Sequence, residues 1–339
     1  MYQYKSIFIS ISGMDPGWII GKISNDLMEV FNNLGIDCQV GSPAEYKDQE
    51  VCYHMGWAYA TPQKNAKINP IFITHIDDKL KENLLVSLKD KFDYFISMSV
   101  EDKQFLIDLG FPLEKCFGLT LPIRNTYIRP LSIGIFSGVY LDGRKNEQWL
   151  LDFCIENQTS QLFNFVFIGP GWGKFVDKLT KLQCSFEWHH TSRVMPFEYE
   201  FQQQKLQNLD YYFYPGFDGG AMGSYDAYFY GVKLIIADDG YHKSIPYIDS
   251  PFSNYDEFIR ILSELGRKQK DKIDFFKVNN PINYGNTLLK IWNNSYTSKP
   301  FKPNATKSVL EKKRNFYAKI SLRRILSNIK SLVYKLLNK

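Results

Sequence analysis

The sequence lacks the features that mark membrane-spanning, secreted and disulfide-stabilised proteins. No stretch approaches 18 consecutive apolar residues, and the first residues show no basic segment followed by a long apolar one. The five cysteines are odd in number and far apart, a pattern typical of buried thiols in a reducing compartment rather than of a disulfide framework or a cysteine metal site. We therefore expect a cytoplasmic protein without a transmembrane segment.

Positive charge is scarce outside the last part of the chain. The formal net charge is +5, yet residues 307–339 contain ten Lys or Arg and a single acid, Glu311. The remainder is therefore slightly acidic, which argues against a nucleic-acid groove across it. Residues 315–339 place apolar side chains on one helical stripe and cations mainly elsewhere, a pattern that favours contact with an anionic membrane surface. Packing of this helix on the protein, or pairing of two subunits through it, is the alternative.

Apolar strand-like runs alternate with helix-like segments along the chain. KSIFISIS at residues 5–12 precedes a helix-like segment at 19–35, and LSIGIFSGVY at 131–140 precedes one at 145–157. The other strand-like runs are IDCQVGS, NPIFITHID, FDYFISMS, FNFVFIGPG, CSFEWHHT, DYYFYPG and VKLIIADD, the apolar run KCFGLTLPI closes the first half, and AMGSYDAYFYG at 221–231 is a further helix-like segment. Two prolines interrupt the alternation around residues 122–132. Length and alternation predict an α/β protein with two doubly wound, Rossmann-like domains. The predicted division is residues 1–128, residues 129–285, and C-terminal helices over 286–339.

Two glycine-rich turns follow strand-like runs without matching a known phosphate-binding fingerprint. IGPGWGK at residues 168–174 lacks the spacing and the Ser or Thr of a P-loop, and Gly13, Gly17 and Gly21 do not fit the dinucleotide-binding pattern. Tight strand-to-helix turns explain both segments. Backbone amides at such turns also bind phosphate or sugar oxygens, so Gly13 and Gly169 are candidate binding residues.

The segment YPGFDGGAMGSYDAYFYG is the most specific one in the chain. Gly219 and Gly220 allow a ligand to approach the backbone where the helix that follows is expected to begin. Eight positions separate Asp218 from Asp226, and we expect this spacing to place Asp226 about two helical turns below Asp218 on the same side. Carboxylates at these places accept hydrogen bonds from sugar and ribose hydroxyls. A helix cap at Asp218 and a solvated side chain at Asp226 are the alternative.

This segment resembles the place where retaining GT-B glycosyltransferases carry two Glu separated by seven residues. Here Asp218 and Asp226 stand in the two Glu positions, each one methylene shorter, and Asp226-Ala227 matches the family's Glu-Ala. Further segments match in the same order: the glycine loop GMDPGW, FISMSVEDKQFLIDLGFP, LSIGIFSGVYLDGRKNEQWLLDF and FVFIGPGW. The resemblance implies two Rossmann-like domains facing across a cleft. It also implies transfer of a sugar from a nucleotide-sugar to an acceptor, with retention and without a required metal or other cofactor.

The resemblance implies roles for single residues of the second half. Lys145 aligns with the lysine that neutralises the leaving diphosphate in the family. The family's preceding Arg falls nearer Val139, so Arg144 is a candidate substitute. Asp218 would face the donor sugar, and Asp226 would hold the ribose.

Three further residues are candidates for ligand contacts. His75, at the end of a strand-like run, would face the acceptor or the transferred sugar, with Asp77 and Asp78 as orienting partners. His190 and Arg193 follow the strand that in this family leads to the nucleobase loop. Two adjacent His would also suit a metal, but no third ligand has the spacing to support one.

These observations together predict a membrane-peripheral glycosyltransferase that acts on a lipid-linked or surface-polysaccharide precursor. Its expected partners are a nucleotide-sugar donor, a glycan or lipid-linked acceptor and an anionic membrane, but no nucleic acid. The shortened acids and the displaced Arg keep a second class open, a nucleotide-sugar-binding subunit without turnover. A GT-B-shaped sugar-nucleotide epimerase is the third class.

Overall fold

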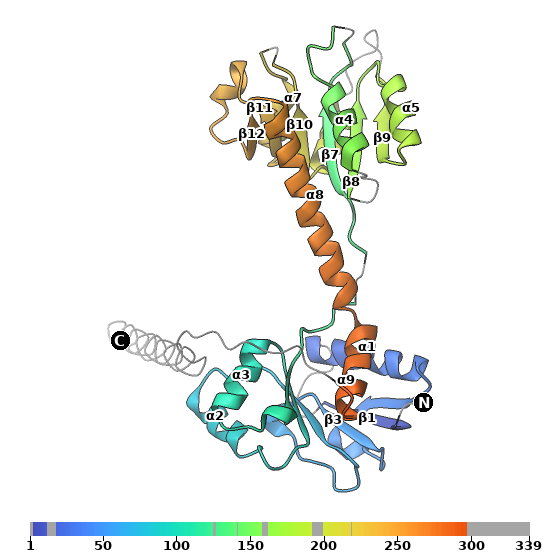
Figure 1. Ribbon diagram of the computed structural model, residues 1–339, viewed down its shortest axis with the longest axis vertical. Helices are drawn as coiled ribbons and strands as arrows, with labels where there is room; N and C mark the ends of the chain where they lie inside the picture. The colour runs from blue at the N-terminus through green and yellow to red at the C-terminus, as the bar shows by residue number, and fades with distance from the viewer. Residues whose placement is uncertain are drawn as a thin grey trace, which may run out of the picture. The chain divides into compact units, whose positions relative to one another are not determined.

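The protein divides into two compact units (Figure 1). The first unit comprises the described residues up to 124 and those from Phe276 onward, and the second comprises Tyr127–Phe275. The predicted boundaries after residues 128 and 285 stay predictions. The computed structural model describes residues 3–11, 18–124, 127–140, 142–157, 162–191, 199–217 and 219–296.

The first unit is built on a parallel sheet of six strands in the order β2-β1-β3-β4-β5-β6. The strands are β1 (Ser6–Ser10), β2 (Asp37–Gly41), β3 (Val51–His54), β4 (Pro70–Ile73), β5 (Tyr94–Ser97) and β6 (Cys116–Gly118). The α-helices are α1 (Ile19–Asn33), α2 (Lys79–Val86), α3 (Val100–Asp108) and α9 (Pro281–Trp292), and the 3-10 helices are η1 (Pro43–Glu45), η2 (Trp57–Tyr59) and η3 (Leu113–Lys115). Ile7 of β1 lies between Cys38 of β2 and Val51 of β3.

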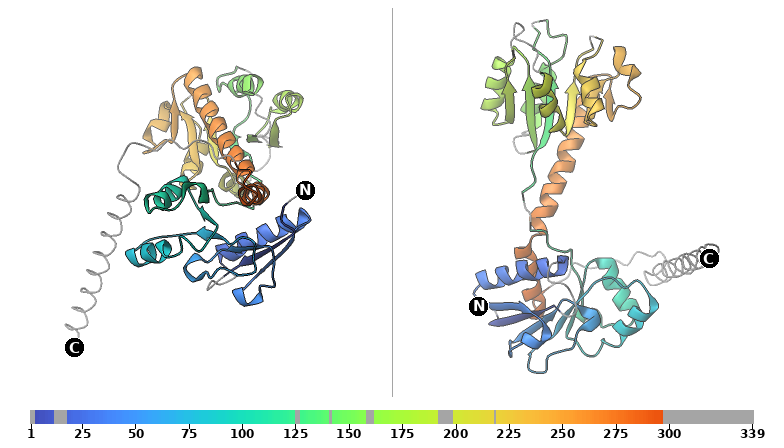
Figure 2. Two further views of the ribbon diagram at one scale, coloured as in Figure 1. Left: turned by 60° about the horizontal axis from the view of Figure 1, so that its bottom comes forward. Right: turned by 180° about the vertical axis from the view of Figure 1, so that it is seen from behind.

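Both faces of the first sheet are covered, as Figures 1 and 2 show. Phe72 of β4 packs in a cluster with Phe31 of α1 and Leu288 of α9, whereas the preceding residue, Ile71, packs in another cluster with Phe105 of α3. Because successive strand residues point to opposite faces, a strand covered on both sides reads as a continuous apolar run. The sequence PIFI is such a run.

The second unit is built on a parallel sheet in the order β12-β11-β10-β7-β8-β9. If β7 to β12 are numbered 1 to 6 and the sheet is read from β9 to β12, the order is 3-2-1-4-5-6. This is the strand order of dinucleotide-binding doubly wound folds. The strands are β7 (Leu131–Phe136), β8 (Phe163–Ile168), β9 (Ser185–His189), β10 (Tyr211–Tyr214), β11 (Lys233–Ala237) and β12 (Ser250–Phe252). The helices are α4 (Gln148–Asn157), α5 (Gly173–Lys181), α6 (Tyr199–Gln207), α7 (Gly223–Phe229), the 3-10 helix η4 (Gly240–Ser244) and α8 (Tyr255–Val278), whose last residues belong to the first unit.

The predicted fold class, α/β with two doubly wound Rossmann-like parallel sheets, is confirmed. Two strands were missed, β3 and β12. β3 lies inside the first sheet between β1 and β4, yet it has only four residues and is reached from β2 through the short η1 rather than through an α-helix. Since η2 follows it, β3 has no α-helix directly before or after it in the chain, whereas β4, of equal length, is followed by α2.

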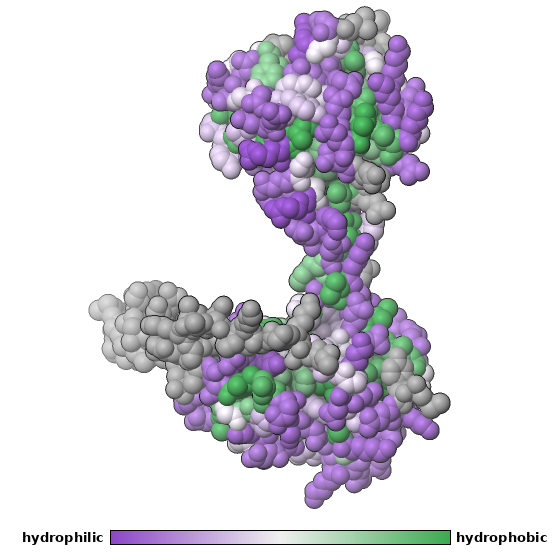
Figure 3. Space-filling view, viewed as in Figure 1, coloured by the Kyte–Doolittle hydropathy of each residue, from purple (hydrophilic) through white to green (hydrophobic). Residues whose placement is uncertain are grey.

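Polar residues cover most of the visible surface (Figure 3). All five cysteines are buried free thiols, as expected, and burial raises the pKa of Cys52 to about 12. Within the described ranges, no helix has the length and apolar character to cross a membrane. The basic segment at residues 315–339 lies outside the described residues.

Candidate functional site

The order of the second sheet indicates where a ligand binds. From β7 the chain proceeds through β8 to β9 on one side, and from β10 through β11 to β12 on the other, so the direction reverses between β7 and β10. In open α/β sheets, ligands bind outside the carboxyl ends of the strands at such a switch point. The loops after β7 and β10, residues 137–147 and 215–222, therefore border the candidate site.

Lys145, from the loop after β7, extends over the end of β10. Its Nζ donates to Ser137 Oγ at 2.5 Å and lies 4.3 Å from the centre of the Tyr140 ring and 5.4 Å from that of Tyr214, the last residue of β10. Ammonium groups are attracted to aromatic faces at such distances. The structure thus holds a half-buried positive charge at the switch point, where an anionic group of a ligand would be neutralised.

Hydrogen bonds from the residues next to Lys145 fix this loop. Asn146 has a positive φ of 51°, a conformation that Asn tolerates better than most residues, and its Nδ2 donates to the carbonyl of Pro215 at 2.9 Å. The carboxylate of the buried Glu147 accepts from the backbone N–H of Tyr140 at 3.2 Å. The first bond joins the loop after β7 directly to the loop after β10.

Arg144 shares the Tyr140 ring with Lys145 but is more exposed. Its guanidinium carbon lies 4.1 Å from the ring centre, and its Nε lies 3.7 Å from the carboxylate of Asp142, with 48% of the side chain exposed. Exposed ion pairs of this kind contribute little to the free energy of unfolding. The structure therefore brings both predicted cations to one loop, while only Lys145 reaches the end of β10.

The glycine segment after β10 packs against η4 through backbone contacts. Gly219 accepts from the N–H of Tyr241 at 3.1 Å, and Gly220 has a φ of +109°. A Cβ at Gly220 would lie 2.9 Å from the ring of His242, so the position has no room for a side chain. Asp218, the predicted donor-sugar contact, lies outside the described residues.

His242 was not predicted as a site residue, yet it holds this segment. The ring is fully buried, its Nε2 accepts from the N–H of Ala221 at 2.9 Å, and its Nδ1 lies 2.9 Å from the carbonyl of Ala237 at the end of β11. Because an amide N–H only donates, Nε2 must be the unprotonated nitrogen and Nδ1–H the donor. The only signal in the sequence was a single His shortly after a strand-like run.

Asp226 lies at the start of α7, a helix that begins later than predicted. The helix begins at Gly223 rather than at residue 221, so Asp226 is in its first turn. Gly219 and Gly220 have positive φ values and are not helical. Asp218 lies outside the described residues, so its expected spacing from Asp226 stays a prediction. The Oδ1 of the half-buried Asp226 accepts from the hydroxyl of Tyr199 at 3.2 Å. An acid in this position is favoured by the helix dipole.

Gly169 directly follows β8 and so also lies at the carboxyl ends of the strands. With a φ of +146°, it donates from its N–H to the carbonyl of His189 and accepts at its carbonyl from Trp188 Nε1, both at 3.1 Å. A Cβ here would lie 2.5 Å from the carbonyl oxygen of Ser137, so Gly169 packs directly against the loop after β7. Its backbone groups already have these protein partners, and its predicted ligand contact stays a prediction.

The remaining predicted residues are spread over the molecule. His190 is exposed just after β9, with its ring 5.6 Å from that of Trp188. His75 is exposed after β4 in the first unit, where Asp77 and Asp78 both engage Lys81. Their predicted roles stay predictions. Gly13 and Arg193 lie outside the described residues.

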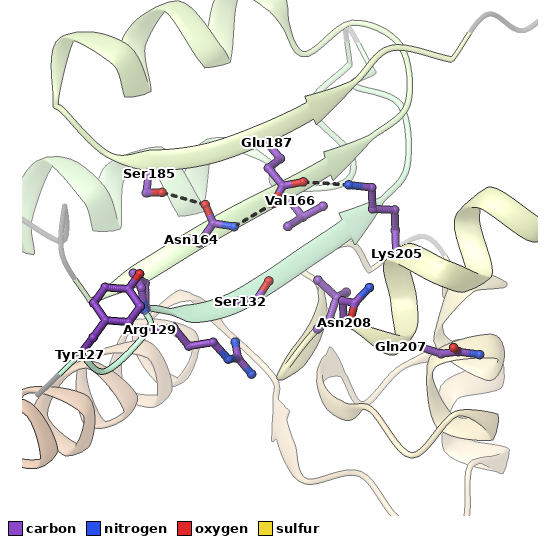
Figure 4. A pocket seen from close by; sticks show the side chains of 12 residues that line it. Tyr127, Arg129, Ser132, Asn164, Val166, Ser185, Glu187, Lys205, Gln207 and Asn208 are labelled. Atoms are coloured by element: carbon purple, nitrogen blue, oxygen red, sulfur yellow. Dashed lines mark hydrogen bonds and ion pairs between the residues drawn. The ribbon is translucent and has the colours of Figure 1, made fainter. Parts of the chain in front are cut away.

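A separate pocket lies toward the amino-terminal ends of β7, β8 and β9, whereas the candidate site lies at the carboxyl ends of the strands. It has a volume of about 660 Å³ and opens on one face of β7, β8 and β9, beside the end of α6 (Figure 4). Arg129, Asn164 and Glu187 are among the residues that line it. Within the described ranges, no group of three or more His, Cys, Asp or Glu residues is arranged to hold a metal ion.

No protein-family model and no curated protein sequence matches this chain. Solved structures that are similar to it include the lipopolysaccharide outer core galactosyltransferase WaaB in its apo form, 14% identical, with a TM-score of 0.34 over 86% of this chain and 98% of that one. HepE of Anabaena, in complex with UDP and glucose, is 11% identical, with a TM-score of 0.33 over 86% and 100% of the two chains. The catalytic domain of the cholesterol-α-glucosyltransferase from Helicobacter pylori is 15% identical, with a TM-score of 0.31 over 46% and 99%. These low values leave the function of this chain to be inferred from its own residues.

Proposed function

We propose that this protein is a glycosyltransferase that uses a nucleotide-sugar donor and a glycan or lipid-linked acceptor. The observation that carries the proposal is the position of Lys145, whose Nζ lies 4.3 Å from the Tyr140 ring centre and 5.4 Å from that of Tyr214, where the strand order of the second sheet reverses. A nucleoside diphosphate is the leaving group of such a transfer, and its developing charge requires a fixed cation. Lys145 supplies that cation.

The glycine segment and Asp226 complete a donor site at the same carboxyl ends of the strands. Gly219 and Gly220 bring bare backbone to the switch point, and Asp226 in the first turn of α7 offers a carboxylate for ribose hydroxyls. In this proposal Asp218 faces the donor sugar, His190 and Arg193 contact the base, and Gly13 and Gly169 border the donor.

Further features of the proposal come from the likeness of its motifs to retaining GT-B enzymes. They are transfer with retention, no required metal, and a cytoplasmic location at an anionic membrane surface contacted through residues 315–339. His75 of the first unit is assigned to the acceptor or to the transferred sugar. Arg144 assists Lys145.

Thermal unfolding with UDP, GDP, CMP, ADP and dTDP tests the donor site. A ligand at 100 times its dissociation constant adds about 2.7 kcal/mol to the free energy of unfolding, which is readily measured. We expect one nucleotide to raise Tm, and we expect the rise to be lost in Asp226→Ala and in Lys145→Ala. Lys268→Ala, an exposed lysine of α8 that pairs with Glu264, is the matched control and should keep the rise.

The outcomes separate the functional classes. No shift with any nucleotide would refute the transferase assignment. A shift without donor hydrolysis or transfer would indicate a nucleotide-sugar-binding subunit, and conversion of the donor sugar without an acceptor would indicate an epimerase.

A further inference from the structure

The pocket beside α6 is lined by polar side chains from one face of β7, β8 and β9. Ser132, Asn164 and Ser185 are neighbours in register on β7, β8 and β9 and point to the same face. The next residues along the strands point to the opposite face, where Phe165 is fully buried. Parallel sheets are normally apolar on both faces. The polar part of this face is confined to the beginning of β7 and β8 and to β9, since Val166 and Ile168 further along β8 are apolar and buried. This part of the face is suited to contact with water or with a polar ligand.

α6 covers this face only in part. The structure describes all nine residues of α6, and only Leu206 among them is buried. The Glu187 side chain on β9 stays 46% exposed, and Lys205 of α6 stays 28% exposed. Figure 4 shows these side chains and Asn164 around the open surface. The volume of about 660 Å³ falls within the range of small-molecule pockets, about 300–1,000 Å³.

Hydrogen bonds hold the polar side chains of this face in place. Ser185 Oγ donates to Asn164 Oδ1 at 2.7 Å, and Lys205 Nζ donates to Glu187 Oε2 at 2.9 Å. The bond from Lys205 lowers the pKa of Glu187, so this carboxylate is ionised at neutral pH. Side chains fixed in this way reduce the ordering cost of binding.

The charges in the pocket are balanced. Lys205 is paired with Glu187, and Arg129 forms two bonds of 2.7 Å with the carboxylate of Asp210. No excess positive charge is left for a phosphate or a nucleotide in this cluster. The ligand that fits is neutral and rich in groups that both donate and accept hydrogen bonds, since carboxamide, carboxylate and ammonium groups line the same surface.

An exposed aromatic ring borders the polar surface. Tyr127, 75% exposed, lies in the lining of the pocket. The apolar C–H face of a sugar ring packs on such an aromatic face, while its hydroxyls meet the polar groups. A protein partner fits less well, because the central part of protein interfaces is depleted of charged residues.

We infer that this pocket binds a neutral oligosaccharide segment of the acceptor glycan, away from the site of transfer. Arg129 precedes β7, and Asn164 and Ser185 stand at the beginning of their strands, whereas Lys145 and Gly220 follow the carboxyl ends. The pocket thus lies toward the amino-terminal ends of the strands, and the donor site lies at the carboxyl ends of strands of the same sheet. The inference rests on the proposed function, because a glycan acceptor is the reason for such a site.

Saturation-transfer NMR on the full chain tests this inference, with maltotriose, cellotriose and N-acetyllactosamine as probes. We expect at least one probe to bind, and we expect Asn164→Ala and Tyr127→Ala each to raise its Kd at least tenfold. Tyr127→Ala changes an exposed side chain and should leave the fold intact. Arg267→Ala, which removes an exposed side chain paired with Asp271 on α8, is the control and should leave Kd unchanged.

Several results would overturn the inference: no saturation transfer to any probe, unchanged Kd in both variants, displacement of the sugar by inorganic phosphate, or a monomer–dimer equilibrium shifted by the same two variants. The nucleotide melting series on the same samples separates the two proposals. Sugar binding without nucleotide binding would refute the donor site and leave the pocket as a sugar site without an acceptor role, and the reverse result would refute the pocket alone.

Discussion

His242 Nε2 accepts the backbone N–H of Ala221 at 2.9 Å and thereby ties the segment after β10 to the end of β11. His242→Ala would remove a partner from the half-buried amide of Ala221 and from the buried carbonyl of Ala237, and an unsatisfied buried group costs about 1–3 kcal/mol. We expect Tm to fall by several degrees and the Ala221 amide to exchange faster with solvent. His190→Ala, which removes an exposed ring, should change neither quantity measurably. Unaltered exchange at Ala221 in His242→Ala would contradict this role.

Gly219 and Gly220 form a matched pair, because both have positive φ but only one is crowded. Gly219→Ala places a methyl group in open space, and its cost is limited to backbone strain of about 1 kcal/mol. Gly220→Ala places the methyl group 2.9 Å from the His242 ring. We expect Gly220→Ala to lower the free energy of unfolding by at least about 1 kcal/mol more than Gly219→Ala in urea titrations. Equal losses would show that the ring moves aside freely.

Lys145 and Arg144 differ in their reach toward β10, which predicts different effects on turnover. If Lys145 neutralises the leaving diphosphate, Lys145→Ala should lower kcat by about 100-fold, the scale seen for loss of one transition-state donor. Arg144→Ala should cost less than tenfold, because the side chain is about half exposed and pairs with Asp142. Donor hydrolysis or transfer, measured with the nucleotide-sugar identified by melting, decides between them. A larger loss in Arg144→Ala would reverse the assignment.

The lowered pKa of His54 leads us to expect a specific pH dependence of the free energy of unfolding. Burial lowers the pKa of this ring to about 4, against about 6.5 in an unfolded chain. Between these values the unfolded state binds a proton that the folded state does not, so the free energy of unfolding falls as the pH drops from about 6.5 to about 4. The loss from this ring amounts to roughly 3 kcal/mol at the lower end.

Urea titrations at pH 7 and pH 5 measure this effect. The difference between the two pH values should shrink in His54→Asn relative to the unsubstituted protein. His75→Asn, which removes an exposed imidazole, serves as the control and should keep the full difference. An unchanged pH dependence in His54→Asn would place the titrating group elsewhere.

Most of the fold was predictable because buried strands and amphipathic helices leave a periodic pattern in the sequence. KSIFISIS and LSIGIFSGVY predicted β1 and β7, and the helices that follow them were placed within a few residues. β3 was missed, since four residues between short connections carry no periodicity. The glycine run after β10 was expected to lie between a strand and a helix, where the positive φ at Gly219 and Gly220 favours that residue type.

The sequence by itself determined the fold class, the free thiols and the type of residue at each strand end. Only the tertiary structure decided which of these ends meet. Lys145 and Tyr214 are far apart along the chain, and they come together because β10 pairs with β7 rather than with β9, the strand that precedes it. His242 meets Ala221 because β10 also pairs with β11, the strand that precedes η4. Strand pairing depends on contacts between distant segments, and local patterns of residues do not encode it.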